Sequence, residues 1–232
     1  KYGNPDLEPY EATNFDLALE YYSGDFTYAS AGIFRKDIDN AIYATIQKDA
    51  TINGVSFNDG VETYINADDS TLTGLEASVQ YGLENGLFVA VNLTHMLDNE
   101  STFSFEDSLQ YTTPFRKLAD DAANFSVGYD QGPWDIRLAM NYRSSYLDYL
   151  ADEEGDIDSV SADNSRFTDD HAQWDLTAKY KVNDQLTLKL EAINMGNEPE
   201  YYYWGRADRL SQYDEYGASY TLGLTYRLGG KS

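Results

Sequence analysis

Three features are scarce in this sequence. Cysteine is absent, which excludes disulfides, thiolate metal sites and a cysteine nucleophile. Only 16 of the 232 residues are Lys or Arg against 40 Asp or Glu, and the formal charge of −24 excludes nucleic acid as a main partner. No apolar run approaches the roughly 18 residues that a membrane helix needs. The chain is therefore either soluble or meets a membrane through β-strands.

Aromatic side chains, in contrast, are abundant. They make up 15% of the chain and include 21 Tyr, 10 Phe and 3 Trp. Tyrosine on this scale is typical of interfacial girdles or binding surfaces rather than of a routine core.

Apolar and polar residues alternate with a period of two through most of the chain, as expected for strands with two chemically different faces. In one stretch Trp134, Ile136 and Leu138 point one way while Asp135 and Arg137 point the other. Only the phase of 26–46 stays open. The pattern predicts nine strands, near 11–23, 26–47, 64–82, 86–98, 119–131, 134–148, 170–182, 185–196 and 214–228.

Strand length and the sorting of connections favour a membrane barrel. Strands of about 12 residues or more exceed the usual length in a sandwich and suit a tilted crossing of a bilayer. Tight turns such as 131–133 alternate with long loops near 48–63, 99–118, 149–169 and 197–213, the pattern of periplasmic turns and extracellular loops. Since the first and ninth strands would run parallel, we expect an arc of a larger barrel.

Five segments, taken in order, resemble the late barrel strands of TonB-dependent outer-membrane receptors. They are GNPDLEPYEATNFDLALEYY at 3–22, FRKDIDNAIY at 34–43, LTGLEASVQY at 72–81, ANFSVGYDQGPWDIRLAMNYRS at 123–144 and NMGNEPEYYYW at 194–204. The resemblance implies an all-β, antiparallel transmembrane β-barrel of about 22 strands with a plugged lumen, of which residues 1–232 would be the C-terminal nine strands. The family's plug domain and TonB box have no counterpart in this sequence, and Tyr226 is followed by Arg227, Leu228 and GGKS rather than ending the chain on an aromatic residue.

The same resemblance implies a function. It indicates a receptor of the bacterial outer membrane, not an enzyme, that takes up a scarce nutrient, an oligosaccharide or a ferric siderophore, by active transport. The implied partners are outer-membrane lipid and lipopolysaccharide, the TonB–ExbB–ExbD complex through the plug and TonB box, the ligand, and a surface lipoprotein; no cofactor is implied. The low Lys and Arg content favours a carbohydrate over an anionic chelate. A passive porin-like barrel and a secreted carbohydrate-binding β-sandwich remain as alternatives.

The best candidates for ligand contact form an aromatic and basic stretch in the last long loop. Rings can stack on sugars or on the aromatic groups of a siderophore, and guanidinium groups can clamp carboxylates. The stretch comprises Tyr201, Tyr202, Tyr203, Trp204, Arg206 and Arg209. The alternative is that these rings belong to the outer interfacial girdle.

Other charged residues have more ordinary expectations. Those on the polar phase of the strands are expected to line the lumen and to pair across strands: Arg137, Arg143, Lys179, Lys181, Lys189 and Glu191. The acidic run 148–158 offers weak calcium ligands in Asp152, Glu154, Asp156 and Asp158, but Gly155 is misplaced for an EF-hand loop, which favours a solvated loop without a metal. Neither His95 nor His171 has a convergent set of partners, and we identify no catalytic constellation.

Overall fold

The computed structural model describes residues 2–24, 27–47, 50–52, 54–57, 61–104, 110–150, 163 and 165–228. Its main sheet follows the chain through nine strands, each antiparallel to the next, and β9 (Gln110–Thr113) adds to the end of β8. These strands are β1 (Glu11–Ser23), β2 (Thr27–Asp39), β7 (Asp69–Gly82), β8 (Leu87–Ser104), β10 (Asp121–Gln131), β11 (Trp134–Arg143), β14 (His171–Lys181), β15 (Leu186–Ile193) and β18 (Ser219–Tyr226).

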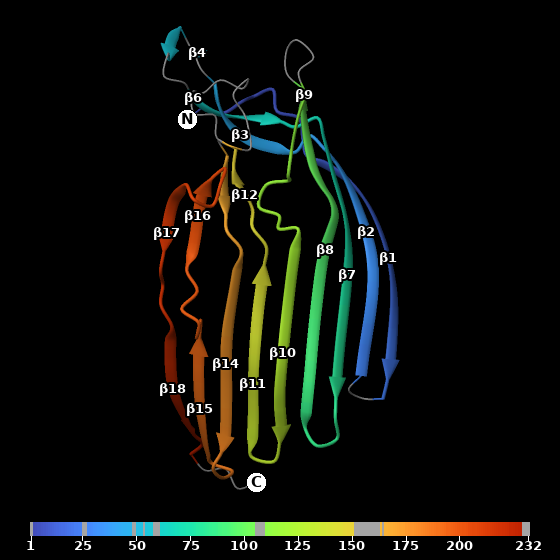
Figure 1. Cartoon of the computed structure of the whole chain (residues 1–232), viewed down its shortest axis with the longest axis vertical. Helices are drawn as coiled ribbons and strands as arrows, with labels where there is room; N and C mark the ends of the chain where they lie inside the picture. Colours follow the sequence, from blue (N-terminus) through green and yellow to red (C-terminus); the bar gives the residue numbers. More distant parts are fainter. Residues whose placement is uncertain are drawn as a thin grey trace.

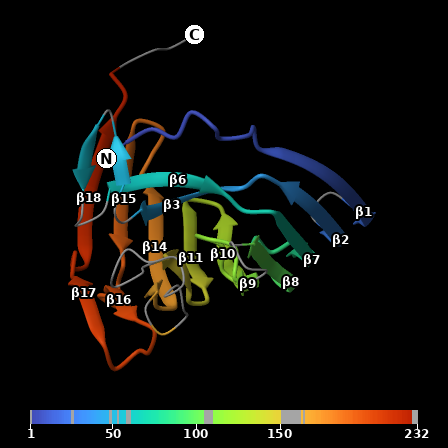
Figure 2. The same ribbon diagram turned by 90° about the horizontal axis from the view of Figure 1, so that it is seen from above.

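The nine strands form a single curved wall (Figures 1 and 2). They match the predicted strands in number and order, and the antiparallel all-β prediction is confirmed. The β-sandwich alternative is wrong, because a sandwich needs two sheets of similar extent packed face to face. No helix long and apolar enough to span a membrane occurs among the described residues.

One predicted strand is interrupted. The prediction ran from 26 to 47, whereas β2 ends at Asp39 and Asn40 adopts a positive φ of 59° that ends the extended conformation. The chain then enters β3 (Ile42–Gln47), which pairs with β6 (Val61–Asn66) in a separate ribbon. The side-chain amide of Asn66 donates to the carbonyl of Asn40 at 2.8 Å and holds the break. The predicted strand 64–82 likewise begins as β6 and resumes as β7.

Connections are sorted between the two ends of the wall (Figure 1). Short turns join β7 to β8, β10 to β11 and β14 to β15 at one end, which we call the turn end. The turn after β7 closes with a hydrogen bond from Leu83 N to Leu87 O at 2.8 Å, and Gly86 in it has a φ of 86° that favours glycine. Longer connections lie at the opposite end, the loop end. The predicted sorting is therefore confirmed for the described strands.

The strand register builds one apolar face across the wall. Residues directly opposite each other in neighbouring strands share a face, so a single row can be followed from β7 to β18. That row is Tyr81, Val89, Val127, Leu138, Leu176, Ala192 and Tyr220. On this face Leu222 is 81% exposed and Leu224 is 67% exposed. Apolar side chains left this open need a nonaqueous surrounding, as the outside of a membrane barrel has.

The adjacent row on the opposite face is mostly polar or small. It consists of Gly82, Phe88, Gly128, Arg137, Thr177, Glu191 and Thr221. The register also assigns the stretch whose phase stayed open, because Ile33 lies opposite Leu17 and Leu75 and therefore on the apolar face. We call the two surfaces the apolar face and the polar face of the wall.

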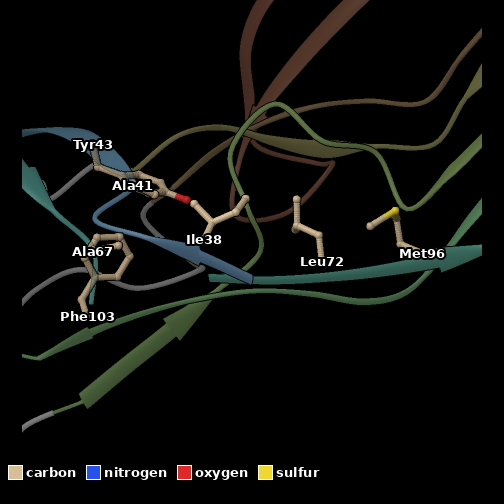
Figure 3. Close-up of a cluster of buried hydrophobic side chains, with 7 residues drawn as sticks. All are labelled: Ile38, Ala41, Tyr43, Ala67, Leu72, Met96 and Phe103. Atoms are coloured by element: carbon tan, nitrogen blue, oxygen red, sulfur yellow. The ribbon is translucent and has the colours of Figure 1, made fainter. Parts of the chain in front are cut away.

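The buried core lies at the loop end of the polar face (Figure 3). Ile38, Leu72 and Met96 project from that face of β2, β7 and β8, and Tyr43 and Ala67 cover them from β3 and the residue after β6. All of these side chains are at most 7% exposed. The β3–β6 ribbon is therefore folded over the polar face rather than away from the wall.

A basic residue on the apolar face should impair membrane assembly. We expect Leu222→Arg or Leu188→Arg to destabilise the barrel by about 2–4 kcal/mol for a site near the bilayer midplane, because the guanidinium would enter hydrocarbon. Urea unfolding in micelles and heat-dependent gel mobility of the full-length receptor would measure the loss. Thr187→Arg, on the polar face beside Leu188, is the matched control; equal damage at both faces would contradict the register.

Candidate functional site

A second sheet continues the wall beyond the loop ends of its last strands. It contains β12 (Tyr146–Tyr149), β13 (Arg166–Thr168), β16 (Glu200–Trp204) and β17 (Leu210–Asp214), in that order. Each of these strands is the chain neighbour of β11, β14, β15 or β18, and the two sheets have the same order, so the upper sheet prolongs the lower one (Figure 1). We call it the rim sheet.

The predicted aromatic stretch lies on both faces of the rim sheet. Alternation along β16 places Tyr201 and Tyr203 on one side and Tyr202 and Trp204 on the other. Tyr203 stacks on Phe167 with ring centroids 5.6 Å apart, and Tyr201 meets Tyr213 edge to face at 6.4 Å. These four rings form a continuous aromatic ladder on one face.

The other face combines rings with charge. Arg166 lies opposite Trp204 in the register, and its guanidinium is 5.0 Å from the centroid of the Tyr202 ring, a cation–π contact. Arg166 Nη1 also donates to Gln212 at 3.4 Å. We call Tyr202, Trp204, Arg166 and Gln212 the inner rim surface, because contacts described next join it to the polar face.

Two residues of the polar face reach this side of the rim sheet. Arg143 and His171 lie opposite each other at the loop ends of β11 and β14, in the same row as Glu76. Arg143 Nη2 is 2.7 Å from a carboxylate oxygen of Glu200, and His171 Nδ1 is 3.7 Å from the other. Glu200 is on the same face of β16 as Tyr202, so the inner rim surface continues the polar face.

Asp148 organises the inner rim surface. A bulge between Leu147 and Tyr149 interrupts the pairing of β12 with β13 at this residue. Its carboxylate accepts hydrogen bonds from Nε and Nη2 of Arg166, and its carbonyl accepts one from Arg116 Nε at 2.8 Å. The Arg116 guanidinium lies 5.8 Å from the centroid of the Tyr149 ring. One acidic residue thus orders two arginines, each beside a tyrosine ring.

Arg206 and Arg209, the two basic residues predicted to contact a ligand, lie in the connection between β16 and β17. Arg206 donates to the carboxylate of Asp208, two residues away, at 2.7 Å and 3.1 Å. This hydrogen bonding lowers the pKa of the exposed Asp208 carboxyl. Arg209 Nη1 donates to the carbonyl of Asp163 at 2.9 Å. The side chains of both arginines have partners within the connecting loops, and their backbones are hydrogen-bonded to Trp204, whose N–H donates to Arg209 O at 2.9 Å and whose carbonyl accepts from Arg206 N at 2.6 Å.

Partial burial raises the pKa of two tyrosine hydroxyls and one carboxyl group at the rim sheet. It raises the pKa of the Tyr202 hydroxyl, with the nearby Glu200 carboxylate adding to the effect. It also raises the pKa of the Tyr203 hydroxyl and of the Asp169 carboxyl. The tyrosines therefore remain neutral hydrogen-bonding groups at physiological pH, suited to binding rather than to proton transfer.

The polar-face residues predicted to pair across strands do so in part. Lys179 contacts Asp135 on the neighbouring strand at 2.7 Å, whereas Lys189 contacts Glu191 on its own strand at 2.6 Å. Arg137 lies 5.1 Å from the centroid of the Phe88 ring. That ring occupies the space over Gly128, where an added Cβ would come within 2.3 Å of it. Lys181 lies opposite Thr187.

The weak calcium candidates Asp152, Glu154, Asp156 and Asp158 lie outside the described residues. Within the described part of the chain, no group of three or more His, Cys, Asp or Glu side chains could hold a metal ion. His95 pairs with Asp121 at 2.7 Å on the apolar-face side of β8, at an exposed position near the loop end.

The sequence pattern does not single out Arg166, Asp148 or Gln212 of the inner rim surface and its surroundings. Arg166 belongs to a strand of three residues inside a predicted loop, too short for alternation to be visible. Asp148 falls at the end of a predicted strand and at the start of an acidic run, and its role depends on a bulge. The only available signal is the pairing of an isolated Arg with nearby acidic residues.

Comparison with known proteins identifies the family. Residues 1–195 match the family described as TonB dependent receptor-like, beta-barrel. The chain is 22% identical over 195 residues to the vitamin B12 transporter BtuB of Photobacterium profundum, and the match covers 83% of this chain and 27% of that protein.

Solved structures show the same fold. The ferric enterobactin receptor PfeA of Pseudomonas aeruginosa, in a G324V mutant, superposes with a TM-score of 0.62 at 18% identity, covering 94% of this chain and 31% of that one. The siderophore receptor PirA of Acinetobacter baumannii gives a TM-score of 0.62 at 18% identity, covering 96% of this chain and 32% of that one. The copper transporter OprC gives a TM-score of 0.63 at 16% identity, with 96% and 31% covered.

A curved antiparallel wall with one apolar and one polar face defines this class of protein as a transmembrane β-barrel, here an open arc of one. The chain belongs to the TonB-dependent receptor family and represents part of its barrel. It spans between 27% and 32% of the length of these relatives.

Loss of Arg166 should loosen the rim sheet. We expect Arg166→Gln to destabilise it by about 1.5–3 kcal/mol, because the partly buried Asp148 carboxylate would lose its charged donors. Hydrogen exchange of peptides covering β12 and β13 in the full-length receptor would report the change. Arg206→Gln removes an exposed pair and should leave the same peptides unaffected; similar effects from the two substitutions would argue against a special role for Asp148.

Proposed function

We propose that this chain is the C-terminal portion of an outer-membrane, TonB-dependent transporter whose barrel has about 22 strands. The observation that carries the proposal is the strand register from β7 to β18, which shifts once, between Thr73 and Gly74, and separates an exposed apolar face from a polar one. The polar face would line the lumen, and its charged residues, including Lys179 and Lys189, would contact a plug domain. Active uptake would draw on the TonB–ExbB–ExbD complex through that plug and its TonB box.

The inner rim surface would form part of the ligand vestibule. Tyr202 offers a ring supported from one side by a guanidinium, and Gln212 offers an amide beside it. Rings and amides in this arrangement suit sugars, by stacking and by hydrogen bonds to hydroxyl groups. Arg166 and Arg143 already bind Asp148 and Glu200, which reduces their attraction for an anionic ligand. We therefore favour an oligosaccharide as substrate.

A ferric siderophore remains the second substrate class. The relatives include receptors described as ferric enterobactin and siderophore receptors. The ring faces of the inner rim surface would also accept catechol groups by stacking. The passive porin-like alternative differs from both because passive uptake needs no energy source. Uptake measurements with and without TonB distinguish it from active transport.

The opposite surface of the rim sheet would contact the membrane boundary. Its aromatic ladder, Phe167, Tyr203, Tyr201 and Tyr213, stands beyond the loop end of the wall, where aromatic girdles and lipopolysaccharide sugars meet. On this proposal Tyr201 and Tyr203 would contact lipid or lipopolysaccharide rather than the ligand. A surface lipoprotein would bind to the outermost loops.

Uptake by whole cells tests the function. Cells producing the full-length receptor are supplied with labelled maltoheptaose or ferric enterobactin, with and without TonB. Saturable uptake of either probe that stops without TonB is expected. Uptake that persists without TonB, at a rate linear in concentration, would instead establish the porin-like alternative.

Paired substitutions test the vestibule. We expect Tyr202→Ala with Trp204→Ala to lower affinity for the accepted probe by about 10-fold or more, since each lost stacking contact is worth about 0.5–1.5 kcal/mol. Isothermal titration with the purified receptor gives the affinity, and surface labelling controls for abundance. Tyr201→Ala with Tyr213→Ala is the control from the opposite face. A larger loss in the control pair would reverse the assignment of the two faces.

A further inference from the structure

Arg143 joins three separate segments at the junction of the two sheets. It is the last residue of β11, and its Nη1 donates to the carbonyl of Asp169, just before β14, at 2.7 Å. Its Nη2 donates to Glu200, the first residue of β16, at 2.7 Å. The guanidinium also lies 4.9 Å from the centroid of the Tyr146 ring in β12. One side chain therefore contacts the start of β12, the approach to β14 and the start of β16.

The ion pair between Arg143 and Glu200 is sheltered. The two side chains are 25% and 27% exposed, whereas Arg206 and Asp208 in the exposed pair are 67% and 68% exposed. His171 also lies near Glu200, with Nδ1 3.7 Å from its carboxylate and 3.3 Å from the carbonyl of Pro199. Such charge-assisted bonds are stronger than those of exposed pairs, which contribute little.

The connection from β15 to β16 is fixed at a second point. Asn194, with a φ of 53°, accepts from Glu198 N at 2.8 Å and donates to Glu198 O at 2.9 Å, closing a tight loop. Beyond that loop, a backbone bond from Asp169 N to Tyr201 O at 2.8 Å and the Glu200 carboxylate hold the start of β16 against the wall.

We propose that Arg143 is a positioning residue for the ligand surface: by holding Glu200 it sets the register and the facing of β16. A strand has a period of two, so a slip of one residue at Glu200 would exchange Tyr202 and Trp204 for Tyr201 and Tyr203 on the inner side. Arg143 itself need not touch the ligand. The effect on ligand binding rests on the proposed function. The contact of Arg143 with Glu200, which we call the clamp, is testable without any ligand.

Arginine suits this place better than lysine. The two bonds leave from different guanidinium nitrogens at the same time, toward a carbonyl and a carboxylate, while the planar group lies beside a ring. A lysine ammonium is a point donor on a flexible stem and cannot keep this geometry. Arg143→Lys should therefore have an intermediate effect, and Arg143→Gln the full one.

Hydrogen exchange of the full-length receptor in micelles tests the clamp. In Arg143→Gln and Glu200→Gln, we expect exchange in a peptide covering 200–204 to accelerate by about 10-fold or more, the factor that corresponds to losing a charge-assisted bond. A peptide covering 172–181 in the main sheet should stay within about twofold of the wild type. Arg206→Gln, which removes the exposed pair in the connection between β16 and β17 of the rim sheet, should change exchange in neither peptide.

Charge reversal separates positioning from general stability. Arg143→Glu combined with Glu200→Arg should restore at least part of the protection of 200–204, whereas each single reversal should abolish it. Unchanged exchange in Arg143→Gln would overturn the proposal, and so would equal acceleration in 172–181. If Arg143→Gln fails to reach the membrane, Arg143→Lys decides: wild-type exchange in 200–204 would overturn the proposal.

Probe binding tests the consequence for the ligand surface. Arg143→Gln should weaken binding of the accepted probe, maltoheptaose or ferric enterobactin, by about 10-fold, and the reversed pair should recover it. Faster exchange with unchanged binding would overturn the positioning role and leave the proposed function standing. If the wild type binds neither probe, the proposed substrate classes fail. The facing of β16 can then be tested without a ligand, by labelling a Tyr202→Cys receptor on intact cells with an impermeant maleimide. Equal labelling with and without Arg143→Gln would overturn the positioning proposal.

Discussion

Backbone hydrogen bonding in the absence of water is the constraint on which this structure depends. Within hydrocarbon every N–H and C=O group needs a protein partner, so strands can cross only when each is paired on both sides. The described strands satisfy this from β2 through β15, and the antiparallel order makes β1 and β18 run in the same direction. Those two cannot close the ladder antiparallel to each other, so a complete barrel needs further strands between them.

Continuous strand pairing determines which face of the wall each side chain lies on. Since opposite residues share a face, one apolar position in β7 determines the facing of its partners through to β18. The order of strands is kept in the rim sheet, but the register shifts at the bulge beside Asp148 and again at Tyr202 and Tyr203 in the pairing of β16 with β17, and the turn at Asn194 separates β15 from β16. Side chains, rather than backbone pairing alone, must then orient the rim strands. The ionic contact of Asp148 lies at the bulge, and that of Glu200 lies at the first residue of β16.

Much of the fold could be predicted from the sequence because alternation is a local property. The nine wall strands and the sorting of turns and loops follow from it. The break at Asn40 could not be predicted, because Ile42 continues an apolar pattern and the groups that hold the break, the side chain of Asn66 and the N–H of Ala67, are distant in sequence. The fold of β3 and β6 over the polar face depends similarly on Tyr43 meeting Ser101, 58 residues away, at 2.8 Å.

The candidate residues of the last long loop were predicted as one group, whereas the structure divides them between two faces of β16. A run of Tyr201, Tyr202, Tyr203 and Trp204 appears as one group in the sequence, whereas pleating divides it into two surfaces with different neighbours. Composition cannot distinguish them; the partners across the sheet, Phe167 on one side and Arg166 on the other, do. Consecutive aromatic residues in a strand are therefore compatible with both explanations at once, because alternate rings lie on opposite faces.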